Sequence, residues 1–148
     1  LDIIVGNLGT QNVVYLQDGQ TNDPPSPPSG TFPTTTPIGN DPDSPTTKVV
    51  ADDLDKDGKL DLVVANRDEE NQIYLAEDAT GDVLDDDSLP NAPSSTLALP
   101  YNNWPDGFLG AEWQKNKLTT MDIAVADFNG DDVLDIVTAE KGAPNFLY

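Results

Sequence analysis

Two short segments of this chain place oxygen-bearing side chains at the same positions, 1, 3, 5 and 9 of a loop. Each loop leads into an apolar run, at residues 62–65 and 136–139. Alternate residues of a tightly turning loop can direct their side chains to one centre, and the carbonyl of position 7 can add another oxygen. Calcium takes about six to eight oxygen ligands, so the pattern predicts two calcium sites. The expected ligands are Asp53, Asp55, Asp57, Lys59 (by its carbonyl) and Asp61 in the first acidic loop, and Asp127, Asn129, Asp131, Val133 (by its carbonyl) and Asp135 in the second.

The residues within and after these loops support a cation site that is not an EF-hand. Gly58 stands where the first loop turns sharply, since glycine adopts a positive φ at little cost. Asp132 holds that place in the second loop, and Asp tolerates the left-handed region better than most residues. An EF-hand needs a bidentate Glu at position 12, where Val64 and Thr138 stand, and flanking helices that the sequence does not predict. Solvated turns are the alternative explanation, but the shared spacing favours metal binding.

The acidic loops belong to a longer unit that occurs three times. In each copy an aspartate precedes an apolar run, and an Asn-x-x-Tyr sequence begins ten residues after that aspartate. The aspartates are separated by 59 and 74 residues, which fits a blade-sized repeat with a variable connection. They are Asp2, Asp61 and Asp135, and the later sequences are 12–15, 71–74 and 145–148. Asp2 takes the place of the last ligand of a third, truncated site.

Each unit has the pattern of β-strands joined by turns. The apolar runs are nearly continuous, which predicts strands covered on both faces, as in stacked sheets. Weaker candidates for a fourth strand lie at residues 31–36 and 96–99. Tyr15, Tyr74 and Tyr148 recur at equivalent places, and we expect them to pack between repeats rather than to bind a ligand.

With these motifs the chain resembles the FG-GAP/VCBS repeats, which build the β-propeller of integrin α subunits and occur in many secreted proteins. The resemblance covers residues 1–16, 49–75 and 123–148. It implies an all-β fold with blades of four antiparallel strands and calcium in the hairpin between the first two strands of a blade. It also implies that calcium is structural rather than catalytic, and it carries the ligand roles onto the same ten residues. Asp132 departs from the glycine that the family prefers.

About ten strands, or two and a half blades, are too few for a closed propeller. We therefore expect either an excerpt from a longer chain or copies that pack head to tail, because a repeat array cut in this way exposes sheet edges. The chain is interpreted as one repeat region, 1–148. Its parts are a partial repeat (1–20), a Pro/Ser/Thr-rich connection (21–47), a second repeat (48–77), a long insertion (78–120) and a third, partial repeat (121–148).

The composition of the chain argues against several classes of partner and of catalysis. The net charge of −20, from 7 basic and 27 acidic residues, argues against nucleic acid and anionic membranes as partners. The chain has no Cys and no His, which excludes disulfides, thiol catalysis and nucleophile–histidine pairs within it. No catalytic residue is assigned, and no apolar run is long enough to span a membrane. Sites of this type fill at millimolar calcium, which predicts an extracellular or cell-surface location.

The two long connections carry further hypotheses. The first is rich in Ser, Thr and Pro and is either a loop that spans a blade or an O-glycosylated segment, with Ser26, Ser29, Thr34, Thr35 and Thr36 as carriers. The second contains Trp104 and Trp113 and forms either a packed cap or an exposed recognition patch.

We therefore predict a non-catalytic, calcium-stabilised module for adhesion, recognition or structural assembly. Its expected partners are proteins, glycans or copies of itself, which would meet open blade edges. The alternative is the scaffold portion of a secreted enzyme that acts on polysaccharide.

Overall fold

The computed structural model of the chain describes residues 3–16, 34–39, 41–76, 95–96 and 118–148. Every regular element in these ranges is a β-strand, and the strands form three antiparallel sheets, β1-β2-β3, β4-β5-β6-β7 and β10-β9-β8. This confirms the predicted all-β fold. None of the described segments is a helix with the length and apolarity that crossing a membrane requires. The strands are β1 (Ile3–Val5), β2 (Asn12–Leu16), β3 (Thr34–Ile38), β4 (Thr46–Asp52), β5 (Asp61–Asn66), β6 (Gln72–Tyr74), β7 (Ser95–Thr96), β8 (Thr120–Ala126), β9 (Asp135–Glu140) and β10 (Phe146–Leu147).

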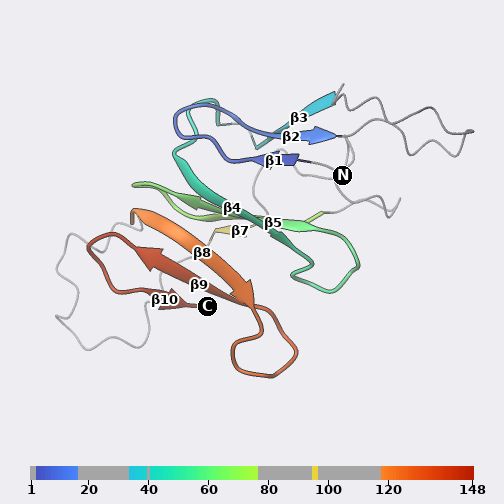
Figure 1. Cartoon of the computed structure of the whole chain (residues 1–148), viewed down its shortest axis with the longest axis vertical. Coiled ribbons are helices and arrows are strands. Elements are labelled where there is room, and N and C mark those ends of the chain that lie inside the picture. The colour runs from blue at the N-terminus through green and yellow to red at the C-terminus, as the bar shows by residue number, and fades with distance from the viewer. Residues whose placement is uncertain (1–2, 17–33, 40, 77–94, 97–117) are drawn as a thin grey trace, which may run out of the picture.

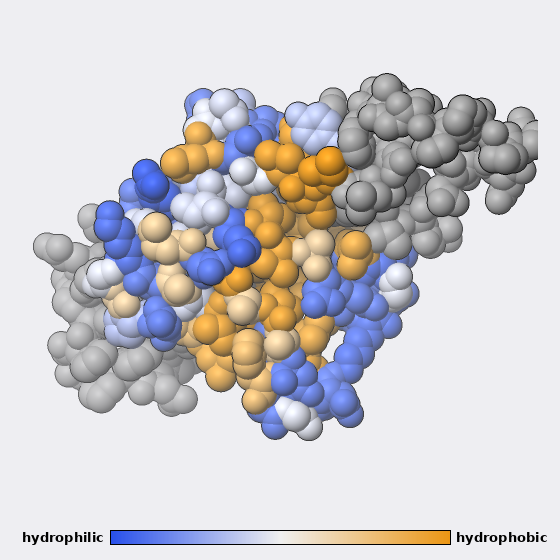
Figure 2. All heavy atoms as spheres, viewed as in Figure 1, coloured by the Kyte–Doolittle hydropathy of each residue, from blue (hydrophilic) through white to orange (hydrophobic). Residues whose placement is uncertain are grey.

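The three sheets are stacked, with β4-β5-β6-β7 in the middle (Figure 1). One apolar core lies between the first and second sheets and contains Val14, Ile38 and Leu62. A second core lies between the second and third sheets and contains Val63 and Ile123. On the face seen in Figure 2, apolar residues form a band across the stack with hydrophilic residues on both sides.

β5 is the strand on which both cores meet. All six of its residues are buried, and successive side chains point to opposite faces. Leu62 and Val64 enter the first core, whereas Val63 and Ala65 enter the second. A half-exposed strand would alternate apolar and polar residues. The continuous apolar run Leu62–Ala65 therefore reflects cover on both faces, as the sequence predicted.

The recurring tyrosines pair with an aliphatic residue of the neighbouring strand. Tyr74 lies opposite Leu62, and both are buried in the first core. Tyr148 exchanges two backbone hydrogen bonds with Ile136, at 2.9 and 3.1 Å, and both side chains contribute to the second core. These contacts confirm the predicted packing role for the second and third tyrosines.

The fourth strands are β3 and β7, which overlap the weak candidates at 31–36 and 96–99. Thr36 lies within β3 with its side chain buried. The glycosylation hypothesis for Thr36 stays a prediction. Thr34 and Thr35 lie in the same strand. The other residues of the two connection hypotheses, Ser26, Ser29, Trp104 and Trp113, lie outside the described ranges, as does Asp2.

Buried polar side chains join the first sheet to the second. The Asn12 amide donates to Thr46 Oγ1 at 2.8 Å, and Thr46 Oγ1 donates to Asn66 Oδ1 at 3.0 Å. All three residues are buried, where such groups need partners. The backbone N–H of Asn66 then donates to Asn71 Oδ1 at 2.9 Å, which leads the chain of bonds towards the next sheet.

The same arrangement joins the second sheet to the third. The Asn71 amide donates to Thr120 Oγ1 at 2.9 Å, and Thr120 Oγ1 donates to the Glu140 carboxylate at 3.0 Å. The Glu140 N–H donates to Asn145 Oδ1, also at 3.0 Å. A carboxylate in the third unit thus replaces the amide of Asn66. The sequence reveals the recurring asparagines but not their threonine partners.

Candidate metal site

The two acidic loops connect corresponding strands, β4 to β5 and β8 to β9, and fold in the same way. In the first loop, Asp55 Oδ1 accepts the N–H of Asp57 at 3.1 Å, and Asp57 Oδ1 accepts the N–H of Lys59 at 2.9 Å. In the second loop, Asn129 and Asp131 accept the N–H groups two residues ahead of them at 2.9 and 2.8 Å. These short Asx turns hold the backbone in a tight coil.

Hydrogen bonds between residues further apart in the sequence close each loop. Asp53 Oδ2 accepts the N–H of Gly58 at 3.0 Å, and Asp61 Oδ2 accepts the N–H of Leu54 at 2.8 Å. The second loop repeats both contacts. The N–H of Asp132 reaches Asp127 Oδ2 at 2.9 Å, and the N–H of Phe128 reaches Asp135 Oδ2 at 2.9 Å. Positions 1 and 9 therefore organise the backbone as well as supply oxygens.

Left-handed backbone occurs at two positions of each loop. Position 6 has φ of 89° at Gly58 and 66° at Asp132, as the turn chemistry predicted. Position 4 has φ of 64° at Lys56 and 81° at Gly130. The left-handed backbone at position 4 was not predicted from the sequence. The signal for it was Gly130, but the first loop has a lysine at that place.

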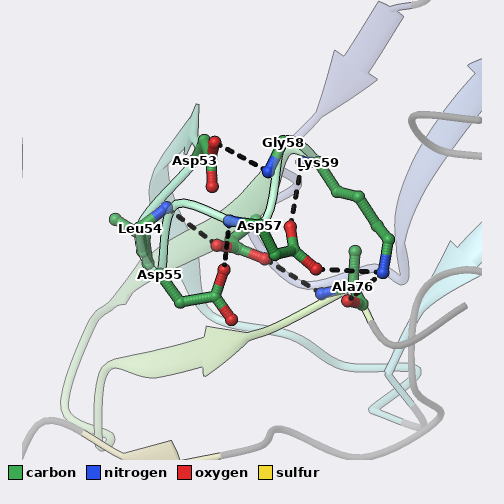
Figure 3. A network of polar contacts seen from close by, with 8 residues as sticks. Asp53, Leu54, Asp55, Asp57, Gly58, Lys59 and Ala76 are labelled. Carbon is green, nitrogen blue, oxygen red and sulfur yellow. Dashed lines mark hydrogen bonds and ion pairs between the residues drawn. The ribbon is translucent and has the colours of Figure 1, made fainter. Parts of the chain in front are cut away.

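The first loop gathers a compact set of carboxylates. Oxygens of Asp53, Asp55 and Asp61 all lie within 4.8 Å of one another, the one such acidic group found among the residues that the structure describes. Figure 3 shows this network of polar contacts. Asp53 Oδ1 is a buried atom with no hydrogen-bond partner in the described part of the chain. A buried carboxylate oxygen without a donor is costly. The donor set and this unpaired oxygen thus fit a metal cation.

Asp57 is placed differently from the other three acidic residues of its loop. Its Oδ2 lies 2.9 Å from the ammonium of Lys59, whose Nζ also donates to the carbonyl of Ala76 at 3.4 Å (Figure 3). The side-chain hydrogen bond from Lys59 lowers the pKa of Asp57. The sequence predicted only the Lys59 carbonyl as a ligand. The structure adds a positive charge on the rim of the site.

Asp61 is the buried member of the group. Burial raises the pKa of Asp61, and the nearby charges of Asp55 and Asp57 act in the same direction. The N–H groups of Ala76 and Leu54 oppose the shift, and Ala76 donates to Asp61 Oδ1 at 2.9 Å. Packing several carboxylates around a buried one is therefore unfavourable by itself. A cation among them would offset that repulsion.

The second loop is more exposed and its oxygens are less converged. Asp127 Oδ1 accepts the N–H groups of Gly130 and Asp131, at 2.6 and 3.2 Å. Burial acts to raise the pKa of Asp127, but the backbone N–H donors, that of Asp132 foremost, outweigh it and lower this pKa. The amide nitrogen of Asn129, not its oxygen, faces Asp135 Oδ1 at 3.4 Å. The predicted ligands of each site thus lie around their own loop. Among the described residues, the compact acidic group forms only in the first acidic loop.

The comparisons with known proteins bear on this architecture of stacked antiparallel sheets, in which acidic loops connect paired strands. A family model for an FG-GAP-like repeat matches residues 1–64. This part of the chain therefore carries an FG-GAP-like repeat, which confirms the resemblance there and suggests a β-propeller-type module. No curated protein and no solved structure gives a match. The third unit extends the pattern through its own hydrogen bonds, which duplicate those of the first acidic loop.

Proposed function

We propose that this chain is a calcium-stabilised, extracellular β-propeller-type repeat module that serves adhesion, recognition or structural assembly and is not catalytic. The observation that carries the proposal is the buried Oδ1 of Asp53, which has no hydrogen-bond partner among the described residues and lies beside the carboxylates of Asp55 and Asp61. A set of oxygen donors suits calcium, whereas magnesium demands a smaller octahedral site and retains several waters.

In the first loop Asp53, Asp55, Asp57, Asp61 and the carbonyl of Lys59 would hold the ion. Asp127, Asn129, Asp131, Asp135 and the carbonyl of Val133 would hold one in the second. When bound, calcium supplies positive charge that offsets repulsion among the carboxylates. The chain itself supplies the preformed Asx turns and the two bonds that close each loop.

The first loop is tied to the sheets by two contacts. Asp61 accepts the N–H of Ala76, which lies two residues after the end of β6. Leu54, at position 2 of the loop, packs against the core between the second and third sheets. Order in the loop therefore favours sheet stacking, and this gives the ion a structural role. Protein or glycan partners would then meet surface loops or open edges of a fixed scaffold.

The experiment is thermal unfolding of the whole chain with and without calcium. Sites with the affinity of extracellular modules, about 10⁻⁴–10⁻³ M, add about 0.4–1.4 kcal/mol each at millimolar calcium. We expect chelation to lower the melting temperature, calcium to restore it with a millimolar midpoint, and magnesium to restore it poorly. A micromolar midpoint would contradict the extracellular location.

Site variants make the test specific. D53N combined with D127N removes one charged ligand from each loop and should abolish most of the calcium-dependent shift. D43N removes an exposed acidic group outside the loops and should leave that shift unchanged. A melt that is the same in excess chelator and in calcium would refute the metal assignment.

A further inference from the structure

The first acidic loop carries a lysine at position 7 whose ammonium is held beside the carboxylates (Figure 3). Lys59 Nζ lies 2.9 Å from Asp57 Oδ2, and the two side chains are 15% and 33% exposed. The same nitrogen donates to the carbonyl of Ala76 at 3.4 Å, and the N–H of Ala76 donates to Asp61 Oδ1 at 2.9 Å. A lysine with so little exposure needs partners for its charge. The ammonium is therefore a fixed positive charge on the rim of the site.

The ion pair occupies Asp57, which the sequence pattern assigns to position 5 of the metal site. Both oxygens of Asp57 are directed to Lys59, because Oδ1 accepts its backbone N–H at 2.9 Å and Oδ2 meets its ammonium. The compact acidic group consists of Asp53, Asp55 and Asp61, and Asp57 is not part of it. One of the expected ligands is thus already bound to a cation that the chain itself supplies.

The second acidic loop is an internal comparison, because it has the same turn without the lysine. Val133 stands at position 7, and its N–H donates to Asp131 Oδ1 at 2.8 Å, as the N–H of Lys59 does to Asp57. Among the described residues, Asp131 belongs to neither of the two ion pairs. The turn at position 5 therefore forms without an ammonium group. What Lys59 adds to the first loop is charge.

We propose that the ammonium of Lys59 is a tethered counter-ion, which stabilises the first acidic loop before calcium binds and lowers the affinity of that loop for calcium. Its positive charge offsets the repulsion among the carboxylates, and this favours the folded loop without metal. The same charge repels an entering divalent cation and competes with it for Asp57. Lys59 is thus a residue that sets calcium affinity. This role concerns the regulation of the proposed calcium site and rests on the proposed function.

The two effects of Lys59 have opposite signs, which distinguishes a counter-ion from a residue that only supports the loop. Removing a supporting residue would lower stability and weaken calcium binding together. Removing a counter-ion lowers stability in chelator but strengthens calcium binding. Tighter binding also increases the stabilisation that calcium provides by mass action. The difference between the melting temperatures in calcium and in chelator should therefore grow.

Isothermal titration calorimetry with calcium tests this role on the full chain in a D127N background, which removes a charged ligand from the second loop. K59M removes the ammonium, and Val133 shows that an apolar residue at this position is compatible with the turn. We expect K59M to lower the calcium dissociation constant by about three- to tenfold, the order of effect for one unit charge close to a divalent ion near the surface. K59Q, a second neutral variant, should do the same. K59R keeps the charge and should resemble the parent.

K48M is the matched control for net charge. Lys48 is 45% exposed and lies 3.1 Å from Asp122, and neither residue belongs to an acidic loop. K48M changes the total charge by the same amount as K59M, but its calcium dissociation constant should equal that of the parent. A gain in affinity as large as that of K59M would show that overall charge sets the affinity, and it would overturn the specific role of Lys59.

Two further results would overturn this role: a K59M variant that binds calcium no more tightly than the parent, or one whose melting temperature in chelator equals that of the parent. If the wild type nevertheless shows its calcium shift, the proposed function stands and only the role of Lys59 fails. A wild type without any calcium shift would instead refute the proposed function. The melts in chelator alone would then decide whether Lys59 acts as a counter-ion.

Discussion

At the scale of single residues, the two acidic loops share left-handed backbone at positions 4 and 6 but place glycine differently. The first loop has Gly58 at position 6 and Lys56 at position 4, whereas the second has Gly130 at position 4 and Asp132 at position 6. Each loop therefore has a glycine at one of its two left-handed positions and a less favourable residue at the other. Neither sequence is optimal for the conformation that both adopt.

G58A and G130A should each lower the free energy of unfolding by about 1–2 kcal/mol, the cost of a left-handed non-glycine residue. An added Cβ meets nothing within 4 Å at either position, so the loss comes from the backbone alone. K56G is the reverse change. Glycine removes the cost of the left-handed backbone at position 4 but increases the entropy of the unfolded chain, so the free energy of unfolding should stay the same or rise slightly. Urea denaturation in calcium measures all three, and a G130A variant as stable as the wild type would contradict the shared geometry.

Tyr148 gives the chain an alkaline dependence. Burial, followed by the charge of Glu140, raises the pKa of Tyr148 to about 12, against about 10 for a free tyrosine. The fold therefore favours the neutral phenol, a contribution that is complete below about pH 10 and is lost as the pH rises towards 12. We expect the melting temperature of the wild type to fall across this range and that of Y148F to fall less. Equal slopes for the two proteins would show that Tyr148 is not responsible.

At the scale of elements, each junction between sheets combines an apolar core with a buried polar chain. Asn71 belongs to both sides of this arrangement, because it accepts the N–H of Asn66 and donates to Thr120. Asn145 holds the corresponding place in the third unit and accepts the N–H of Glu140, but it is exposed. The two asparagines thus have the same local role in different surroundings.

N71A should lower the free energy of unfolding by about 1–3 kcal/mol, because it leaves buried polar groups without partners. N145A is the matched control and should cost less, since water can replace its contacts. Chemical denaturation of both variants in calcium gives the comparison. Equal losses would mean that the asparagine acts only within its own turn and does not couple neighbouring sheets.

At the scale of the whole molecule, the middle sheet contributes to both apolar cores. β5 is buried on both faces, whereas β1 at one end of the stack has an exposed isoleucine. Leu62 and Ile3 occupy equivalent places in their units, opposite Tyr74 and Tyr15. Position in the stack, not position in the repeat, therefore decides how much apolar surface each side chain buries.

L62A should lower the free energy of unfolding by about 2–5 kcal/mol, as expected for a fully buried leucine. I3A should have a much smaller effect in the monomer, because its side chain is already partly hydrated. The comparison requires dilute protein, where association between copies does not contribute. A loss for I3A as large as that for L62A would contradict the stacking order described here.

Much of this architecture could be predicted because repetition made local signals reinforce one another. The spacing of Asp53, Asp55 and Asp61 places three carboxylates on one turning loop, and the apolar run 62–65 indicates a strand with two covered faces. The threonine partners of Asn12 and Asn71 could not be predicted in this way. They come from another unit, and a single threonine has no local pattern that distinguishes it.

The amino-acid sequence by itself determined the strands, the hairpins and the two loops that curl around their own aspartates, because these depend on contacts between residues close in the chain. Tertiary structure alone decided which carboxylates meet. Asp61 is buried, Asp53 Oδ1 has no hydrogen-bond partner among the described residues, and Asp57 pairs with the ammonium of Lys59. It also decided that equivalent residues such as Leu62 and Ile3 differ in burial, since only the order of the sheets determines which faces are covered.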